Sequence, residues 1–312
     1  MSYHRSTMEA AKGKWRGILL EFGLPEACLK DKHGPCPLCQ SEKNFRWDNK
    51  DGNGSYICTC GSGPGAKLAC EFMGKTFKQV ADEIDLMIGN IKVDSAPPRR
   101  DMSDEDRRLA LREVYAATKQ VVPGDLADTY LKSRGFGELI YPKALRFAGA
   151  LRDGEGGVRP CMVATVTDTE GKAVSLHRTF LRPDGLAKAE MEAPRKMMPG
   201  ALPDGACVRL SDGPSASLGI AEGLETALAA SVLYGLPVWA ALTATMLAKW
   251  IPPEGVEDIT IFADNDPKFG GQAAAYQLAH RLAVKGWDVT VLVPALAGAD
   301  FNDELNRRKA IA

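Results

Sequence analysis

Two pairs of closely spaced cysteines, in the strings HGPCPLC and CTC, most strongly constrain what the first part of this chain can fold into. Cysteines paired in this way in a reducing compartment are typical of a metal site and not of disulfides. Zinc takes four sulfur or nitrogen ligands in a tetrahedron, and a hairpin brings the second pair of ligands back to the first. We therefore predict a structural Zn²⁺ site held by Cys36, Cys39, Cys58 and Cys60.

The second cysteine pair is one residue shorter than the usual spacing, which leaves the fourth ligand open. His33, which closely precedes Cys36, is the reserve ligand. The alternative is a group of reduced, buried cysteines without a metal. We favour zinc because so small a hairpin has little apolar core and needs a structural metal to be stable.

The segment KNFRWDNKDGNGSYIC between the two cysteine pairs has the pattern of a β-hairpin, with Asn53-Gly54 as a type I′ turn. Alternation along the strand places Phe45 and Trp47 on one face and Arg46 on the other. Aromatic rings beside basic side chains suit stacking on the bases of single-stranded nucleic acid. The alternative, which does not exclude the first, is that both rings pack on the zinc site or on the next helix.

A length of 312 residues corresponds to about two domains with a small appendage. Composition divides the chain into a Cys- and Gly-rich domain (1–92) and a polar linker around Pro97-Pro98 followed by a helix that Ser103 caps (93–124). A mixed α+β region follows (125–215), in which a hairpin turns at Glu170-Gly171. The last domain comprises residues 216–312.

Strings that resemble apolar strands alternate with helical patterns in that last domain. The strands are SLGIAEG, LPVWAAL, DITIFADND and DVTVLVP, and the helices between them are ETALAASVLYG, ATMLAKWI and GQAAAYQLAHRLAVKG. This alternation is typical of a parallel sheet covered by helices on both faces. The chain shows no apolar run of membrane-spanning length and its N-terminal segment does not resemble a signal peptide, so we expect a cytoplasmic protein with no membrane partner.

Carboxylates follow two of these strands where the strands end. Glu222 closes LGIAE, and Asp264 and Asp266 close ITIFADND. The carboxyl ends of parallel strands share one edge of the sheet, where ligands bind. Oxygen ligands of this kind suit Mg²⁺, which can activate a hydroxyl and neutralise a phosphate leaving group. The net charge is only −1, but the acidic excess lies in residues 216–312, which fits such a site and equally fits a soluble acidic domain. The alternative is that the aspartates only cap the next turn.

At these residues the chain resembles a known family. The segments GIAEGLETALAA, ITIFADNDPKFGGQAAAYQLAHRLA and VTVLVPALAGADFNDEL resemble a Toprim domain, and HGPCPLC with FRWDNKDGNGSYICTCGSG resembles the zinc ribbon of phage- and plasmid-encoded primases. The middle strings YLKSRGF and SLHRTFLRPDGLAKAEMEAPRKMMPG resemble the segment before Toprim in those proteins. The resemblance implies a multidomain α/β protein: a β-rich zinc ribbon, an α+β middle region that begins the primase catalytic core, and a C-terminal Toprim domain with a mostly parallel sheet.

The resemblance also implies roles for individual residues. Glu222 is implied to be the acid nearest the chemistry, with Asp264 and Asp266 as Mg²⁺ or Mn²⁺ ligands. Asp300 and Asp303 match the acidic tail motif, and are implied either to hold a second ion or to position the helix that they open. The residues implied to face nucleotide or template are Arg178, Lys188 and Lys196, with Lys132 and Arg134 as further candidates. The hairpin pattern described above adds Phe45, Arg46 and Trp47 as template-binding candidates in the ribbon.

The expected function is that of a DNA primase, a nucleotidyltransferase that makes short RNA primers. Its expected partners are a single-stranded DNA template, ribonucleoside triphosphates and a separate replicative helicase in a bacterial host cell. Two alternatives share parts of the pattern. A Toprim nuclease or topoisomerase shares the carboxylates, although a topoisomerase also needs a tyrosine domain for which little sequence remains. A zinc-containing accessory protein that binds single-stranded DNA without catalysis shares the ribbon.

Overall fold

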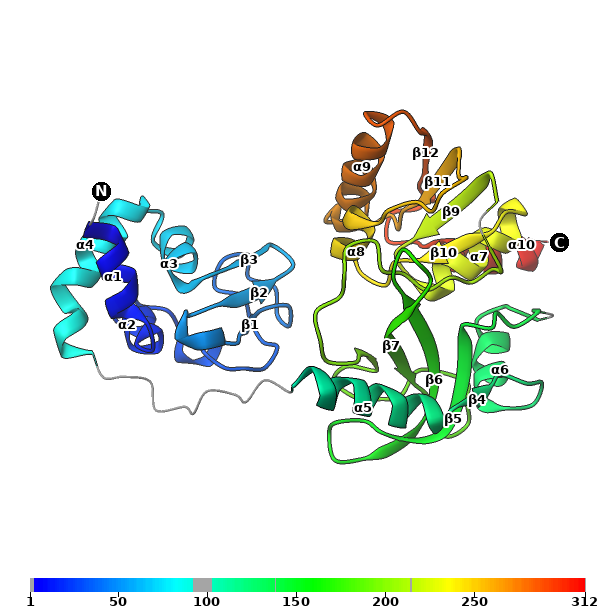
Figure 1. Ribbon diagram of the computed structural model, residues 1–312, viewed down its shortest axis with the longest axis horizontal. Helices are drawn as coiled ribbons and strands as arrows, with labels where there is room; N and C mark the ends of the chain where they lie inside the picture. Colours follow the sequence, from blue (N-terminus) through cyan, green and yellow to red (C-terminus); the bar gives the residue numbers. More distant parts are fainter. Residues whose placement is uncertain (1–2, 92–102, 138, 214, 312) are drawn as a thin grey trace. The chain divides into compact units, whose positions relative to one another are not determined.

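A computed structural model describes residues 3–91, 103–137, 139–213 and 215–311 of the chain (Figure 1). The chain forms two compact units, Met1–Asp101 and Met102–Ala312, which we call the N-terminal and the C-terminal unit. The Pro97-Pro98 part of the expected linker lies outside the described residues. Among the described helices none is both long enough and apolar enough to span a bilayer.

The predicted zinc ribbon is a small antiparallel sheet of three strands in the order β1 (Arg46–Trp47), β2 (Tyr56–Cys58) and β3 (Gly61–Gly63). The expected hairpin is present, but its connection is wider than a type I′ turn. A 3₁₀ turn (Lys50–Gly52) precedes Asn53, whose φ of −90° is not left-handed. Positive φ values occur at Asn49, Asp51, Gly52 and Gly54. The side chain of Asn49 accepts the Gly54 N–H at 2.7 Å and closes the loop.

Helices pack around this ribbon and supply the core that it lacks. They are α1 (Tyr3–Ala11), α2 (Trp15–Glu21), α3 (Gly65–Met73) and α4 (Phe77–Met87), with 3₁₀ turns at Glu26–Cys28 and Ile88–Asn90. Trp15, Tyr56 and Leu68 are buried together in one cluster. Gly65 is required where α3 meets α2, because a Cβ there would lie 2.5 Å from the Trp15 ring. Helices α1 and α2 were not foreseen from the sequence.

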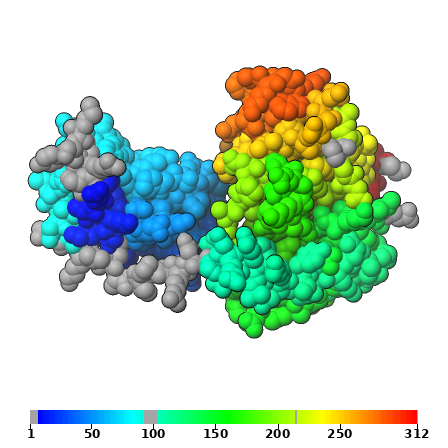
Figure 2. Space-filling view, in the orientation of Figure 1, coloured from blue at the N-terminus to red at the C-terminus, as the bar shows by residue number. Residues whose placement is uncertain are grey.

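The C-terminal unit begins with the α+β region. Ser103 caps α5 (Asp104–Ala116) by accepting the Asp106 N–H at 3.0 Å, as predicted. An antiparallel sheet follows in chain order: β4 (Lys119–Gln120), β5 (Leu145–Arg152), β6 (Val158–Thr167), β7 (Ala173–Phe180) and β8 (Arg195–Met197), with α6 (Leu126–Ser133) between the first two. The predicted hairpin is β6–β7. In the space-filling view α5 and α9 lie at opposite ends of this unit (Figure 2).

The second sheet of this unit is parallel, in the order β10 (Val238–Ala240), β9 (Ser217–Ala221), β11 (Asp258–Phe262) and β12 (Asp288–Leu292). Helices α7 (Leu224–Tyr234) and α10 (Phe301–Ile311) cover one face, and α8 (Ala244–Lys249) and α9 (Gly270–Ala283) cover the other (Figure 1). The strands, their parallel direction and the covering helices are those that the alternating pattern predicts. Central strands β9 and β11 end side by side, so residues that follow them share one edge.

One apolar core joins the two sheets of the C-terminal unit. Leu145 and Met162 of the antiparallel sheet belong to the same buried cluster as Val238 and Phe262 of the parallel sheet. Val208 continues this connection through an antiparallel backbone bridge to Ala240. The α+β region and the parallel-sheet region therefore form one folded body, and a pocket between them has walls fixed by a shared core.

Candidate functional site

The four predicted cysteines of the N-terminal unit come together. Their sulfur atoms all lie within 4.8 Å of one another, with Sγ–Sγ distances of 3.7 Å for Cys36–Cys60 and 3.8 Å for Cys39–Cys58. All four are free thiols. Cys58 ends β2 and Cys60 lies in the turn to β3, so the short C-x-C spacing still lets both sulfurs face the first pair. Four thiols grouped in this way match the donor set of a structural zinc site.

The ionisation of these thiols responds to their crowding. Burial raises the pKa of Cys36 and, more strongly, that of Cys60, where the neighbouring cysteines add to the effect. Hydrogen bonding to Ser41 lowers the pKa of the exposed Cys39 thiol to about 6. A bound divalent cation would compensate the mutual repulsion of several thiolates in one place. His33 is exposed and lies outside the group, so Cys60 fills the fourth position for which His33 was held in reserve.

The aromatic residues of the ribbon face inward. Phe45 is 1% exposed and stacks on Tyr56 with 5.6 Å between ring centroids. Trp47 is also buried, and its indole N–H donates to the Gly54 carbonyl at 3.1 Å. Arg46 points to the other side, as alternation predicts, and pairs with Asp31 at 2.7 Å. Of the two arrangements that the sequence left open, the structure therefore has the one in which both rings pack inside the domain. Neither ring face is available to stack on a base.

In the C-terminal unit, the predicted carboxylates gather at the carboxyl edge of the parallel sheet. Glu222 directly follows β9, and Asp264 and Asp266 follow β11. With Asp300 they line a cavity of about 300 Å³, which we call the acidic pocket. They are spaced more widely than the sulfurs: within the described residues, the cysteines are the only group close enough to share one ion as they stand.

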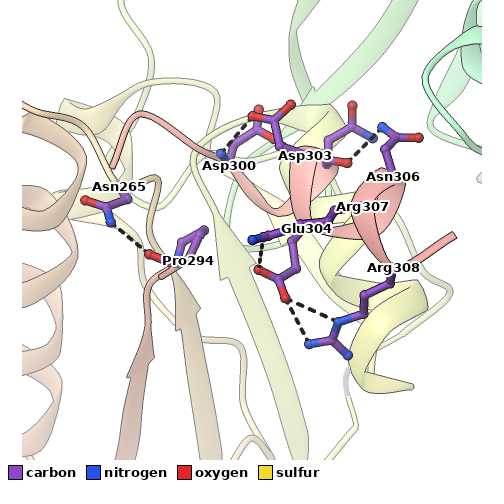
Figure 3. Close-up of polar contacts among 9 residues, drawn as sticks. Asn265, Pro294, Asp300, Asp303, Glu304, Asn306, Arg307 and Arg308 are labelled. Atoms are coloured by element: carbon purple, nitrogen blue, oxygen red, sulfur yellow. Dashed lines mark hydrogen bonds and ion pairs between the residues drawn. The ribbon is translucent and has the colours of Figure 1, made fainter. Parts of the chain in front are cut away.

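Asp300 and Asp303, for which the resemblance left two roles open, occupy different positions. Asp300 lines the pocket, whereas Asp303 lies in the first turn of α10 and does not. Each caps the other: the Asp303 N–H donates to the Asp300 carboxylate at 2.9 Å, and the Asp300 N–H donates to Asp303 at 3.2 Å (Figure 3). Asn265, beside the strand end, donates to the Pro294 carbonyl at 2.8 Å and fixes the adjoining loop. Asp303 is thus placed to position the helix that it opens.

A second cavity of about 390 Å³ adjoins the first and shares Glu222, Asp264 and Asp300 with it. We call it the mixed-charge pocket, because cationic side chains of the α+β region line it together with these acids. Its lining contains Arg134, His177, Lys188, Arg195, Met197, Glu222, Gly223, Leu224, Glu225, Thr226, Leu242, Thr243, Asp264 and Asp300. Acids from one sheet and bases from the other therefore meet in one hollow.

Two of the predicted basic residues lie on the face of their hairpin that does not line the pocket. Arg178 and Lys196 are paired in register across β7 and β8, and neither lines the pocket. Lys196 binds the Asp153 carbonyl at 2.8 Å and Glu155 at 2.9 Å. The next residues along the same strands, His177 and Arg195, do line it. Side chains alternate on a strand, so an offset of one residue selects the opposite face.

The remaining basic candidates divide in the same way. Lys188, on the segment between β7 and β8, lines the pocket. Arg134, at the end of α6, also lines it, whereas Lys132 pairs with Asp128 at 3.0 Å. The guanidinium of Arg178 lies over the Phe180 ring, 5.7 Å from its centroid. Lys132, Arg178 and Lys196 are therefore each held by neighbouring groups, through ion pairs, a hydrogen bond or a ring contact.

The acids of the two pockets are held where ionisation is costly. Burial raises the pKa of Glu222. Burial, together with the neighbouring Asp300 and Glu222, raises the pKa of Asp264 to about 6. Strain is also stored here, because Leu242 adopts a φ of +75° while its N–H donates to the Glu222 carbonyl at 2.7 Å. Carboxylates that repel one another at a strand edge are typical of a cation-binding site and poor structural elements.

Two residues of the first turn of α7 belong to the site although the sequence did not single them out. The Thr226 hydroxyl donates to the Asp264 carboxylate at 3.2 Å. Glu225 is 6% exposed, pairs with Lys188 at 2.9 Å and accepts the Tyr130 hydroxyl at 2.5 Å. Their position in the sequence could have indicated this. Both residues follow Glu222-Gly223 at the start of a helix whose first turn faces the strand edge.

Comparison with known families agrees with this architecture. The zinc-binding domain of primase-helicase matches residues 31–66, a domain of unknown function (DUF7146) matches residues 105–210, and the Toprim domain matches residues 217–310. The chain thus has a primase-type zinc ribbon followed by a Toprim domain. This domain content is that of a primase-like protein, as the sequence resemblance implied.

Solved structures of primases are among the similar folds, at low identity. The zinc-binding and RNA polymerase domains of the Aquifex aeolicus primase are 17% identical, with 98% of this chain and 83% of that one covered at a TM-score of 0.43. The primase fragment of the bacteriophage T7 primase-helicase protein is 16% identical, with 89% and 96% covered and a TM-score of 0.40. A DNA primase domain from Pseudomonas aeruginosa is 15% identical, with 66% and 76% covered and a TM-score of 0.43. The family matches alone support the assignment.

Proposed function

We propose that this protein is a DNA primase that makes short RNA primers on single-stranded DNA by Mg²⁺- or Mn²⁺-dependent nucleotidyl transfer. The observation that carries the proposal is the mixed-charge pocket, where Glu222 and Asp264 face Arg195 and Lys188 in one cavity. Joining a nucleotide to a primer needs acids that hold cations beside bases that hold a triphosphate. A primase-type zinc ribbon on the same chain supplies a domain for the template.

The proposed metal ligands are Glu222, Asp264 and Asp266, with Asp300 available to a second ion. Their oxygen donors fit a hard divalent cation, and the raised pKa of Asp264 reflects a repulsion that such an ion would relieve. When bound, the ion would neutralise charge that develops on the transferring phosphoryl group. Glu222, which lines both pockets, is the residue that we place nearest the reacting atoms.

The chain's own residues have distinct tasks in this proposal. Arg134, Lys188 and Arg195 bind the triphosphate of the incoming ribonucleotide from the wall opposite the acids. Thr226 orients Asp264 through its hydroxyl. The zinc ribbon holds the template through its exposed surface and not through Phe45 and Trp47, because both rings are buried.

A separate replicative helicase is a further proposed partner. The zinc-domain family that the chain matches is that of primase-helicases. The test is a primer assay with and without a helicase from the same host, in which helicase-stimulated primer yield supports the partnership.

The primary experiment incubates the zinc-loaded protein with single-stranded DNA of mixed sequence, labelled ribonucleotides and Mg²⁺ or Mn²⁺. New labelled oligonucleotides that need template support the proposal. Shortened template would favour a Toprim nuclease, and binding without chemistry would favour an accessory protein. Asp258→Asn is the matched control for loss-of-function variants, because Asp258 lies at the opposite end of β11 from Asp264 and pairs with Ser217.

A further inference from the structure

A buried acid beneath the mixed-charge pocket has no part in metal binding as described above. Glu225 is the second residue of α7, and its side chain is only 7% exposed. It contacts two side chains from other parts of the fold: Lys188 Nζ at 2.9 Å and the Tyr130 hydroxyl at 2.5 Å. Tyr130 comes from α6 and is 1% exposed. A buried carboxylate is costly unless it is paired and hydrogen-bonded, and these two contacts satisfy it.

The pairing sets the position of Lys188. A lysine has a long, flexible stem, and on a surface its ammonium samples many positions. Here the ammonium is held by a carboxylate that is itself fixed by a helix and by a tyrosine. Lys188 also sits in a backbone bridge to Leu181, so both its main chain and its side-chain end are fixed. An ammonium has three donors, and Glu225 leaves others to face the pocket that Lys188 lines.

The two consecutive residues Glu225 and Thr226 serve the two walls of the pocket. Thr226 donates to Asp264 on the acidic wall at 3.2 Å, and Glu225 holds Lys188 on the cationic wall at 2.9 Å. One turn of helix therefore contacts both an acid that follows β11 and a base that lies on the segment between β7 and β8. The ionisation of Glu225 supports this interpretation. Burial alone would raise its pKa, but Lys188 and the Tyr130 hydroxyl lower the pKa to about 2, so the ion pair stays charged.

We propose that Glu225, supported by Tyr130, is a positioning residue that holds Lys188 in place for the phosphate groups of the incoming nucleotide. This inference deepens the proposed function and rests on it for the identity of the ligand. A purely structural role makes a different prediction, since a staple between α7 and the β7–β8 segment would affect folding without affecting nucleotide affinity in the folded protein.

The test compares Glu225→Gln, Lys188→Met, Tyr130→Phe and the double variant Glu225→Gln/Lys188→Met in the full zinc-loaded chain. Asp153→Asn is the matched control, because Asp153 is also a buried acid in an ion pair, with Arg159 at 2.9 Å, but does not line either pocket. Two readouts are needed: calorimetric binding of Mg²⁺–GTP and Mg²⁺–ATP, and the ribonucleotide KM and kcat of primer synthesis. Thermal melting reports folding.

We expect Glu225→Gln and Lys188→Met each to weaken nucleotide binding and raise KM by about tenfold or more, with a smaller change in kcat. The double variant should be no worse than Lys188→Met, because the two residues act through one contact. Tyr130→Phe should have a smaller effect in the same direction, and Glu225→Asp, which keeps the charge, should recover part of the loss. Asp153→Asn should melt earlier and bind normally.

Unchanged nucleotide affinity in folded Glu225→Gln overturns the inference, and so does additivity in the double variant. A wild type that binds nucleotide, loses that binding on Glu225→Gln, yet makes no primers overturns the proposed function and leaves the inference standing. A wild type that neither binds nucleotide nor makes primers overturns both.

Discussion

The two candidate metal sites differ in what holds their ligands in place. In the N-terminal unit the sulfurs already lie within 4.8 Å of one another, on turns of a ribbon whose strands are no longer than 3 residues. In the C-terminal unit the carboxylates follow central strands of a sheet that has a continuous apolar core on both faces. We therefore expect the first site to stabilise its own fold when a metal is bound, whereas the second follows strands of a sheet whose apolar core can hold repelling acids together.

Removing a cysteine ligand should have the largest effect, and only in the N-terminal unit. We expect Cys58→Ser to lose zinc and unfold the ribbon, because metal binding supplies folding free energy of several kcal/mol in such small sites. The C-terminal unit should keep its thermal transition. Zinc content and limited proteolysis of both units measure this. Cys70→Ser, which changes a free cysteine outside the cluster, is the control, and a folded, zinc-loaded Cys58→Ser protein would refute the comparison.

The corresponding change in the second site should remove activity and spare the fold. Glu222→Gln is expected to lower primer synthesis by about a hundredfold, since one interaction made in the transition state is worth ~3 kcal/mol. Melting temperature should stay the same or rise, because a buried acid that repels its neighbours has been neutralised. Asp258→Asn should retain full activity. If the Glu222→Gln protein unfolded as the cysteine variant does, the fold would depend on both sites and the proposed difference between them would be wrong.

The scaffold around the second site should be acid-sensitive through a buried histidine. Burial lowers the pKa of His177 to about 4, so the folded state resists a proton that the unfolded chain accepts. The stability that the neutral ring provides is therefore present above pH ~6.5 and is lost as the pH falls toward 4. Between pH 7 and pH 4 the free energy of unfolding should fall by about 3 kcal/mol less in His177→Gln than in the wild type. Hydrogen exchange of β6 and β7 amides measures this difference, and equal losses would contradict it.

The smallest effect separates the two faces of the β7–β8 hairpin. Arg195→Ala should raise the ribonucleotide KM by about tenfold, because its side chain lines the mixed-charge pocket. Lys196→Ala should change KM by less than about twofold, since its ammonium is engaged by Asp153 and Glu155 away from that pocket. Steady-state primer assays at saturating template measure the ribonucleotide KM of both variants. A larger effect of Lys196→Ala would place nucleotide on the other face.

Sequence reasoning succeeded where chemistry depends on local spacing. The cysteine pairs predicted their own cluster, and strand–helix alternation predicted the parallel sheet together with the edge where Glu222 and Asp264 meet. Residue types at strand ends carry this information because topology alone brings such ends together.

Sequence reasoning did not identify the pocket residues where their position depends on which face of a strand or helix packs inward. Arg178 and His177 are adjacent, and only the register of β7 against its neighbours decides which of them meets the pocket. The same holds for Phe45 and Trp47, whose burial depends on α1 to α4, elements that the ribbon pattern does not contain. Glu225 was overlooked because its partners, Tyr130 and Lys188, are remote in the chain.

The contacts of α10 have a consequence for the order of folding. Asn302 and Asn306 donate to the Arg134 carbonyl at 2.7 and 3.2 Å, across sequence separations of 168 and 172 residues. Lys309 adds a bond to the Gly135 carbonyl at 2.5 Å. The end of α6, which carries Arg134 into the pocket, is therefore secured by a helix made much later on the ribosome. Contacts this distant form late because a long loop must close first. A nascent chain can complete its zinc ribbon early, but Arg134 joins the cationic wall of the pocket only after α10 has emerged and docked.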